Sequence, residues 1–425
     1  MNESFISPIR ELWMALQETL YFLPPFPSRI DTLALLSLLL IVGLLVAEWL
    51  RARWGWPRVL GYVIAGTVFG PPLFGWINAD LLAQIRPIAD AAHGLLLLEV
   101  GRRLDLSWLL RNRELLRGSV SDIVLSFLAV YWFVYLVVGL PPVWAAATAA
   151  VTMASAPAVV LLIIEESRAQ GQVTERIMMY SSLSSAVSFI VFVVVLGIVH
   201  TQQAVTWVNI LVHPLWAGGG ACLIGWLASR LTLTLAGMLP KRSLAQVFVL
   251  VAMALLAVGV ARMLGAPVFL TLFLMGAILS LSDKTKVLSY TSIMPEGHWM
   301  LAVILFVVVG ASLPWRDFTW LMGIYALGLL LVRAAAKSLS MALAKGTLPV
   351  GKRLLVSVGI QPLSATAVFM AFEIGQLYPE IGNPALQLAF FSAAIMDIAG
   401  PVLCRFALNR AGETSTEKEN TGGAK

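Results

Sequence analysis

Apolar stretches of roughly 20 residues, each long enough to cross the hydrocarbon of a bilayer, recur from residue 30 to residue 410. Only short polar segments separate them, so no soluble domain fits between them. We therefore predict an all-α polytopic membrane protein with about thirteen transmembrane helices. The predicted spans are residues 30–50, 57–76, 84–104, 116–140, 142–164, 175–200, 206–229, 244–264, 266–282, 296–314, 319–344, 350–376 and 384–408. Two pairs of spans adjoin directly, at Gly139–Pro142 and at Gly265–Pro267.

The composition fits a chain whose solvent is lipid. Charged residues make up 12% of the sequence, whereas they make up about 25% of an ordinary soluble domain. The net charge of +6 does not indicate a nucleic-acid partner, because the basic residues fall in short segments beside the spans. Such clusters follow the positive-inside rule, and most of them lie on one side if the N-terminus is outside and the C-terminus is cytoplasmic. We predict an integral protein of the bacterial inner (cell) membrane with this orientation.

The sequence divides into three parts, of which only the middle one is predicted to be a folded domain. Residues 1–29 form an N-terminal segment, residues 30–408 the transmembrane domain, and the polar residues 409–425 a predicted disordered cytoplasmic tail. Cys222 and Cys404 lie in apolar segments far apart, which is typical of small buried hydrophobic residues. No phosphate-binding loop, zinc-ligand spacing or nucleophile arrangement stands out. We therefore expect neither an enzyme, nor a bound cofactor, nor a resident metal.

Two spans are poor membrane helices, because each carries proline and hydroxyl groups near its middle. The polar or helix-breaking positions are Thr152, Ser155 and Pro157 in one span, and Gln361, Pro362, Ser364 and Thr366 in the other. Backbone groups freed by such breaks must find new partners inside the membrane. The two spans are separated by seven in order, which matches two six-helix halves of opposite orientation around a linker span. Interrupted helices at corresponding positions of inverted repeats point to the midplane site of a transporter.

Several motifs occur in an order typical of one superfamily. They are Pro57-Arg-Val-Leu-Gly-Tyr-Val-Ile-Ala-Gly-Thr-Val-Phe-Gly-Pro71, the segment Leu96–Asp105, Val307-Val-Val-Gly-Ala-Ser-Leu313, the pair Arg333 and Lys337, and Gly400-Pro401. With these motifs the chain resembles the monovalent cation:proton antiporter superfamily over residues 30–410. The resemblance is to its second branch, which contains sodium/proton and potassium-efflux-like exchangers.

The resemblance implies a fold and a mechanism. A dimerisation side, about residues 30–104 and 244–314, would hold a mobile core of residues 116–200 and 319–408. The two broken helices would cross in that core. Movement of the core, like an elevator, would expose the site to either side in turn. The implied partners are protons, a sodium or potassium ion, the lipid bilayer and a second copy of the chain in a homodimer.

Exchange of a cation for a proton needs a group that holds either one. A desolvated carboxylate can do so, because burial brings the pKa of such a group closer to neutral pH. Where the superfamily usually carries an acidic pair, this chain carries Ser184 and Ser185, which can coordinate a cation but cannot titrate near neutral pH. Asp397 and Asp122 are ionisable groups that lie within the core spans, and Lys337 matches the lysine that usually pairs with the family aspartate.

We therefore expect Asp397 or Asp122 to supply the coupling carboxylate, with help from Ser184, Ser185, Thr152 and Gln361. The alternative is a permanent set of salt bridges between these aspartates and Arg333 or Lys337 that only holds the core together. Two other functions stay open. The chain could transport a different solute on the same scaffold, or it could be a non-transporting sensor or the membrane subunit of a complex.

Overall fold

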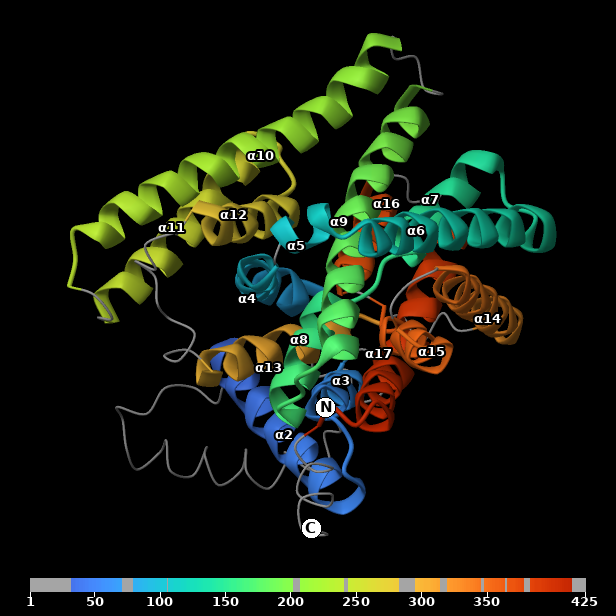
Figure 1. Ribbon diagram of the computed structural model, residues 1–425, viewed down its shortest axis with the longest axis horizontal. Coiled ribbons are helices and arrows are strands. Elements are labelled where there is room, and N and C mark those ends of the chain that lie inside the picture. The colour runs from blue at the N-terminus through green and yellow to red at the C-terminus, as the bar shows by residue number, and fades with distance from the viewer. Residues whose placement is uncertain are drawn as a thin grey trace, which may run out of the picture.

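A computed structural model describes residues 32–70, 79–104, 106–201, 207–240, 244–282, 295–313, 319–344, 348–363, 365–377 and 383–414. Within these ranges the regular structure is entirely helical (Figure 1). The helices are α2 (Thr32–Trp54), α3 (Arg58–Phe69), α4 (Ala79–Arg103), α5 (Leu106–Arg111), α6 (Arg113–Phe133), the π-helical turn η1 (Val134–Val138), α7 (Pro142–Thr152), α8 (Pro157–Ser167), α9 (Gln172–Thr201), α10 (Trp207–Gly237), α11 (Leu244–Met263), α12 (Val268–Ser282), α13 (Pro295–Ser312), α14 (Trp320–Leu343), α15 (Val350–Gly359), α16 (Ala365–Leu377) and α17 (Asn383–Arg410).

Every span predicted from the sequence contains a helix, so the fold is an all-helical membrane protein as expected. Among the described residues, eight helical segments are long and apolar enough to cross a membrane, and the α7–α8 pair counts as one of them. The short helices α3, α12 and α13 are apolar too. The two joints between adjacent spans are turns, and each contains a glycine with a positive φ, Gly139 at 79° and Gly265 at 66°.

The C-terminal end differs from the expectation of disorder from residue 409 onwards. Helix α17 continues to Arg410, and the Glu413 carboxylate accepts hydrogen bonds from the backbone nitrogens of Val173 (2.9 Å) and Thr174 (2.7 Å). These nitrogens belong to the first turn of α9, where a carboxylate is favoured by the free N–H groups and the helix dipole. The first residues of the predicted tail are therefore part of the fold, and residues 415–425 lie outside the described ranges.

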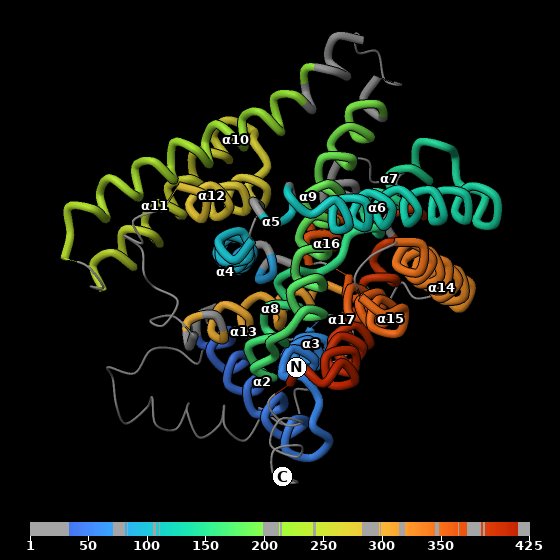
Figure 2. Tube along the Cα trace, viewed as in Figure 1, coloured from blue at the N-terminus to red at the C-terminus, as the bar shows by residue number. Residues whose placement is uncertain are grey.

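The helices pack in two groups (Figures 1 and 2). One group contains α2, α3, α4 and α10–α13, and the other contains α6–α9 and α14–α17. Helix α9 lies between α10–α12 on one side and α6, α14 and α15 on the other. Helices α8 and α17 also contact the first group, through α4 and α13 for α8 and through α3 for α17.

Glycines allow close approach within the first group, at the crossings of α3 with α13 and of α4 with α12. A Cβ atom on Gly66 or Gly310 would overlap the backbone of the other helix at the first crossing. Gly101 and Gly276 do the same at the second crossing. Small residues at such contacts let membrane helices pack through their backbones, where the hydrophobic effect gives little driving force.

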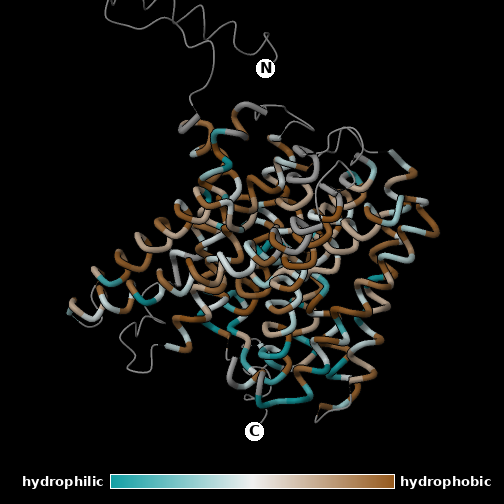
Figure 3. The backbone as a smooth tube through the Cα atoms, turned by 90° about the horizontal axis from the view of Figure 1, so that it is seen from above, coloured by the Kyte–Doolittle hydropathy of each residue, from teal (hydrophilic) through white to brown (hydrophobic). Residues whose placement is uncertain are grey.

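The outer face of the bundle is apolar, as expected for contact with lipid chains. Large exposed hydrophobic side chains lie on α2, α6, α10, α11 and α14. Hydrophilic residues gather at the lower end of the bundle as drawn in Figure 3. In the described part of the chain, Glu166 at the end of α8 lies 3.4 Å from Arg51 and 3.8 Å from Arg405, and its carboxylate also accepts the backbone N–H of Arg58 at 3.2 Å. This acidic side chain thus joins α2, α3, α8 and α17.

Candidate functional site

The two predicted breaks are present, and they cross each other. Helix α7 ends at Thr152, and α8 starts at Pro157, which fits the first turn of a helix because it has no N–H to leave unpaired. Helix α15 ends at Gly359 and α16 begins at Ala365. The backbone N–H of Ala156 donates to the carbonyl of Pro362 at 2.9 Å, so backbone groups freed by one break are satisfied by the other.

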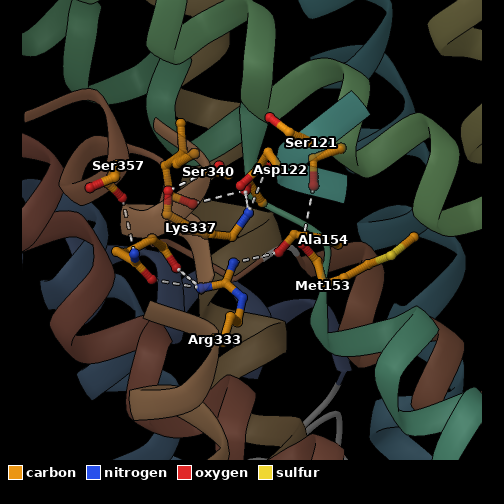
Figure 4. Close-up of polar contacts among 12 residues, drawn as sticks. Ser121, Asp122, Met153, Ala154, Arg333, Lys337, Ser340 and Ser357 are labelled. Carbon is orange, nitrogen blue, oxygen red and sulfur yellow. Dashed lines mark hydrogen bonds and ion pairs between the residues drawn. The ribbon is translucent and has the colours of Figure 1, made fainter. Parts of the chain in front are cut away.

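Arg333 of α14 lies beside this crossing and binds both breaks. Its guanidinium donates to the carbonyl oxygens of Thr152 (2.7 Å), Ala154 (2.7 Å) and Gln361 (2.8 Å), and to the Gln361 side-chain oxygen (3.0 Å). The residue is fully buried, and its side chain points toward the carbonyl of Ala154 in Figure 4. A cation here is favoured by the negative C-terminal ends of α7 and α15. The predicted alternative allowed Arg333 a carboxylate partner, but its guanidinium binds the oxygens of the two breaks instead.

Lys337 lies one turn further along α14 and forms a buried ion pair. Its Nζ atom is 3.0 Å from Oδ2 of Asp122 on α6, and it donates to the Ser155 hydroxyl at 3.1 Å (Figure 4). The Lys337 side chain is 0% exposed and that of Asp122 is 1% exposed. The second carboxylate oxygen of Asp122, Oδ1, has no hydrogen-bond partner in the described part of the protein. Both members of the ion pair are therefore out of water, and one of the two carboxylate oxygens of Asp122 lacks a hydrogen-bond partner among the described residues.

Ser184 and Ser185, the serines predicted to stand in place of an acidic pair, take different roles. The Ser184 hydroxyl donates to the carbonyl of Met153 at 3.1 Å, so it supports the α7–α8 break. Ser185 instead lines a cavity of about 20 Å³ together with Thr366. Neither hydroxyl is hydrogen-bonded to the Asp122–Lys337 pair. The hydroxyl of Thr152 is also engaged, because it donates to the carbonyl of Thr148 at 2.7 Å.

Asp397 is separate from this arrangement. It is 4% exposed on α17, and its Oδ2 atom has no hydrogen-bond partner among the described residues. No ion pair or hydrogen bond within those residues joins it to Lys337 or Arg333. One turn later Gly400 packs against Pro362, where an added Cβ would lie 2.7 Å from the proline Cα. Asp397 therefore lies on the helix that supports the α15–α16 break but takes no part in the ion pair. Ser364 lies outside the described residues.

A larger cavity opens between the two groups of helices. Its volume is about 500 Å³, and its charged lining residues are Arg86, Asp90 and Arg262. Phe189 and Phe269 line both this cavity and the smaller one that reaches Ser185 and Thr366. The Thr366 hydroxyl is 3.2 Å from Nε2 of His93, which connects α16 to α4.

The structure thus unites some predicted site residues and separates others. It brings together Asp122, Lys337, Ser155, Arg333 and Gln361, and it leaves Ser184, Ser185 and Asp397 outside this cluster. Two buried residues next to it were not predicted, Ser119 and Ser126 on the same helix as Asp122. Their hydroxyls have no partner in the described ranges. Their spacing of three and four residues from Asp122 was readable in the sequence.

Comparison of the sequence with known proteins gives a family match and a match to one relative. The family described as "Sodium/hydrogen exchanger, transmembrane" matches residues 36–408. The Na(+)/H(+)-K(+) antiporter GerN of Bacillus cereus is 36% identical over 95 residues, which are 22% of this chain and 24% of that relative. The match therefore spans about a quarter of the length of this relative.

The fold is similar to that of the sodium proton antiporter MjNhaP1 from Methanocaldococcus jannaschii. The structure of that protein at pH 8 matches with a TM-score of 0.69 and 18% identity, and the match covers 89% of this chain and 98% of the other. A second structure of the same protein, an electron microscopy map, matches with a TM-score of 0.66, 20% identity, and 89% and 96% coverage.

Proposed function

The chain belongs to the sodium/hydrogen exchanger family of transmembrane proteins, and on that premise we propose that it exchanges a monovalent cation for protons. The family predicted from the sequence motifs is therefore correct, and it is a family of transporters rather than of enzymes. Structural likeness at 18% identity supports the fold alone, so the activity is argued from the site.

The observation that carries the proposal is the Asp122–Lys337 pair beside two crossing broken helices. A carboxylate that is out of water and bound on one side by an ammonium group can accept a metal cation on its other side. The arriving cation repels the Lys337 ammonium, which favours loss of the lysine proton. Return of the proton then favours loss of the metal cation. The metal cation on Asp122 and the proton on Lys337 thus exclude each other at one buried pair, which is what antiport requires.

Asp122 suits this role better than Asp397, the other carboxylate predicted for it. Only Asp122 has a protonated partner at 3.0 Å that can respond to the arrival of a cation. Lys337 is the family lysine by its motif, and Asp122 takes the place of the missing acidic partner across the core. The predicted alternative, a permanent structural salt bridge, has the same geometry but differs in one testable respect, since it would not change its protonation during transport.

The architecture we propose has thirteen crossings, two inverted six-helix halves and a linker, α10. The two breaks lie at corresponding positions of these halves. The glycine crossings support the same symmetry, because α3 with α13 and α4 with α12 are equivalent pairs under the proposed repeat. We further propose that α6–α9 and α14–α17 form a core that moves as an elevator against the other helices. A homodimer with the N-terminus outside and the C-terminus cytoplasmic completes this proposal.

The test is transport by the purified protein in liposomes that contain a pH-sensitive dye. Addition of sodium or potassium should dissipate an imposed proton gradient with wild type but not with Asp122→Asn. Asp397→Asn is the matched control, since it neutralises a buried carboxylate outside the ion pair, and it should keep at least half of the activity. Loss of transport in Asp397→Asn but not in Asp122→Asn would show that the coupling carboxylate is Asp397 on α17. An inactive wild type would favour transport of another solute, or a role as a sensor or a subunit of a complex.

A further inference from the structure

Most oxygen atoms around the crossing are already engaged by the protein itself. Arg333 binds the carbonyls of the two breaks, as described above. The hydroxyl of Ser155 donates to the carbonyl of Ile360 at 2.8 Å. On α9, the hydroxyl of Ser188 donates to the carbonyl of Ala150 at 2.6 Å, and that of Ser184 is bound to Met153. A transported cation would have to displace Arg333 in order to use the carbonyls of the crossing. The α9 hydroxyls keep their lone pairs, but in the described ranges their hydrogen bonds join them to backbone carbonyls and not to a carboxylate.

One face of α6 is different, because three of its buried side-chain oxygens have no hydrogen-bond partner among the described residues. Ser119, Asp122 and Ser126 are 4%, 1% and 0% exposed, and the atoms Oγ, Oδ1 and Oγ respectively have no partner in the described ranges. At about 100° per residue, the two serines point within about 20° of each other, and Asp122 within about 60° of both. Along the helix axis Asp122 lies about 4.5 Å from Ser119 and about 6 Å from Ser126. Unpaired buried oxygens of this kind are costly unless a ligand satisfies them.

We propose that this face of α6 is the binding site of the transported cation. Oδ1 of Asp122 supplies the charge, and the hydroxyls of Ser119 and Ser126 supply the neutral oxygen ligands on either side. Carboxylate and hydroxyl oxygens are hard ligands, suited to an alkali cation that has lost part of its water. The inference rests on the proposed function for the transport itself. The proposed cation ligands therefore belong to α6, whereas the resemblance to the family would place them on α9, at Ser184 and Ser185.

The groups that face Asp122 from the neighbouring helices are compatible with a cation at Oδ1. Lys337 and Arg333 of α14 and Tyr180 of α9 interact electrostatically with Asp122 from the neighbouring helices. Lys337 binds the opposite carboxylate oxygen, Oδ2, and so leaves Oδ1 free. The guanidinium of Arg333 is held by the carbonyls of the crossing.

The chain offers a matched control on α17. Ser392 is 0% exposed and its hydroxyl has no partner in the described part of the chain, like those of Ser119 and Ser126. It is five residues from Asp397, so the two side chains point about 140° apart and do not form a comparable face. Removal of this hydroxyl tests the effect of a buried serine in the same group of helices outside the proposed site.

The experiment measures the apparent KM for sodium and for potassium in proteoliposomes, and the sodium-dependent rise in melting temperature of the solubilised protein. In Ser119→Ala and in Ser126→Ala the KM of the better cation should rise roughly tenfold, the effect of losing one oxygen contact to a charge. The rise in melting temperature should shrink in parallel. Ser126→Thr keeps the hydroxyl and should keep the KM within about twofold, as should Ser392→Ala.

The outcomes separate this inference from the proposed function. An active wild type whose KM is unchanged in both serine-to-alanine variants would overturn the α6 site and leave antiport standing. Sodium stabilisation that is present in wild type and Ser392→Ala but lost in the α6 variants, without any transport, would support the site and refute antiport. An equal loss in Ser392→Ala would also overturn the inference, because the effect would then belong to any buried serine of the core.

Discussion

Replacing Arg333 by methionine tests whether the guanidinium holds the two broken helices together. Methionine fills a similar length of space but donates no hydrogen bond. The change leaves four buried acceptors without their partner, three backbone carbonyls and the Gln361 side-chain oxygen. Each of these four hydrogen bonds joins α14 to one of the two breaks, so their loss should destabilise the crossing itself.

The magnitude follows from those four bonds. Interhelical hydrogen bonds in membrane proteins average about 0.6 kcal/mol each, which gives a lower value of about 2 kcal/mol. Bonds that involve a charged group contribute at least about 1.5 kcal/mol each, which gives about 6 kcal/mol. We therefore expect Arg333→Met to lower the free energy of unfolding by about 2–6 kcal/mol. Arg333→Lys should recover part of this loss, because an ammonium group reaches fewer of the four acceptors.

The assay is reversible unfolding in mixed micelles, followed by tryptophan fluorescence. Arg262→Met is the control, since Arg262 makes a half-exposed pair with Asp90 at 2.9 Å and such pairs contribute at most about 1 kcal/mol. If Arg333→Met destabilised the protein no more than Arg262→Met, the carbonyls of the breaks would have other partners available. The assignment of Arg333 as their main donor would then be wrong.

Three further predictions concern packing, capping and the contacts of Glu166. Gly400→Ala places a methyl group against Pro362 and should cost about 1–3 kcal/mol in the same unfolding assay, whereas Gly219→Ala, which has open space, should be neutral or stabilising. Glu413→Ala removes the acceptor for the first turn of α9 and should cost about 1–2 kcal/mol; an unchanged value would mean that water replaces the carboxylate. Glu166→Gln weakens the contacts that join α8 to α2, α3 and α17, and faster cleavage at the α2–α3 turn in limited proteolysis would be the expected sign.

The helices and their breaks were predictable because each depends on local sequence. Long apolar runs have few alternatives in a membrane, and Pro157 and Pro362 stand beside polar residues near the middle of their spans. Proline alone is not sufficient for a break, because Pro87 and Pro401 lie inside continuous helices. The pairing of Lys337 with one of the buried aspartates was also expected from charge. Its choice of Asp122 depends on how α6 and α14 pack, which no local pattern encodes.

The role of Arg333 could not be read from the sequence, because its partners are backbone carbonyls whose directions depend on the crossing of two distant breaks. The same holds for Ser184, whose hydroxyl turns to the carbonyl of Met153 rather than to a cation. Glu413 was assigned to a disordered tail on composition, because its contacts with the first turn of α9 join residues that are far apart in the sequence. Ser119 and Ser126 were missed for a different reason, since their spacing from Asp122 was visible but serine is common on packed helix faces.

In the proposed mechanism, the charges beside the crossing determine how exchange depends on membrane voltage. Arg333 and Lys337 contribute two positive groups and Asp122 one negative group. If a cation binds Asp122 as Lys337 releases one proton, the total charge of the moving part is the same in both loaded states. One-for-one exchange of this kind would carry no current, although each uncompensated charge would feel about 2.3 kcal/mol per 100 mV. With the membrane potential held at zero or at about −100 mV by valinomycin and potassium gradients, the final pH gradient reached for a given sodium gradient should therefore be the same.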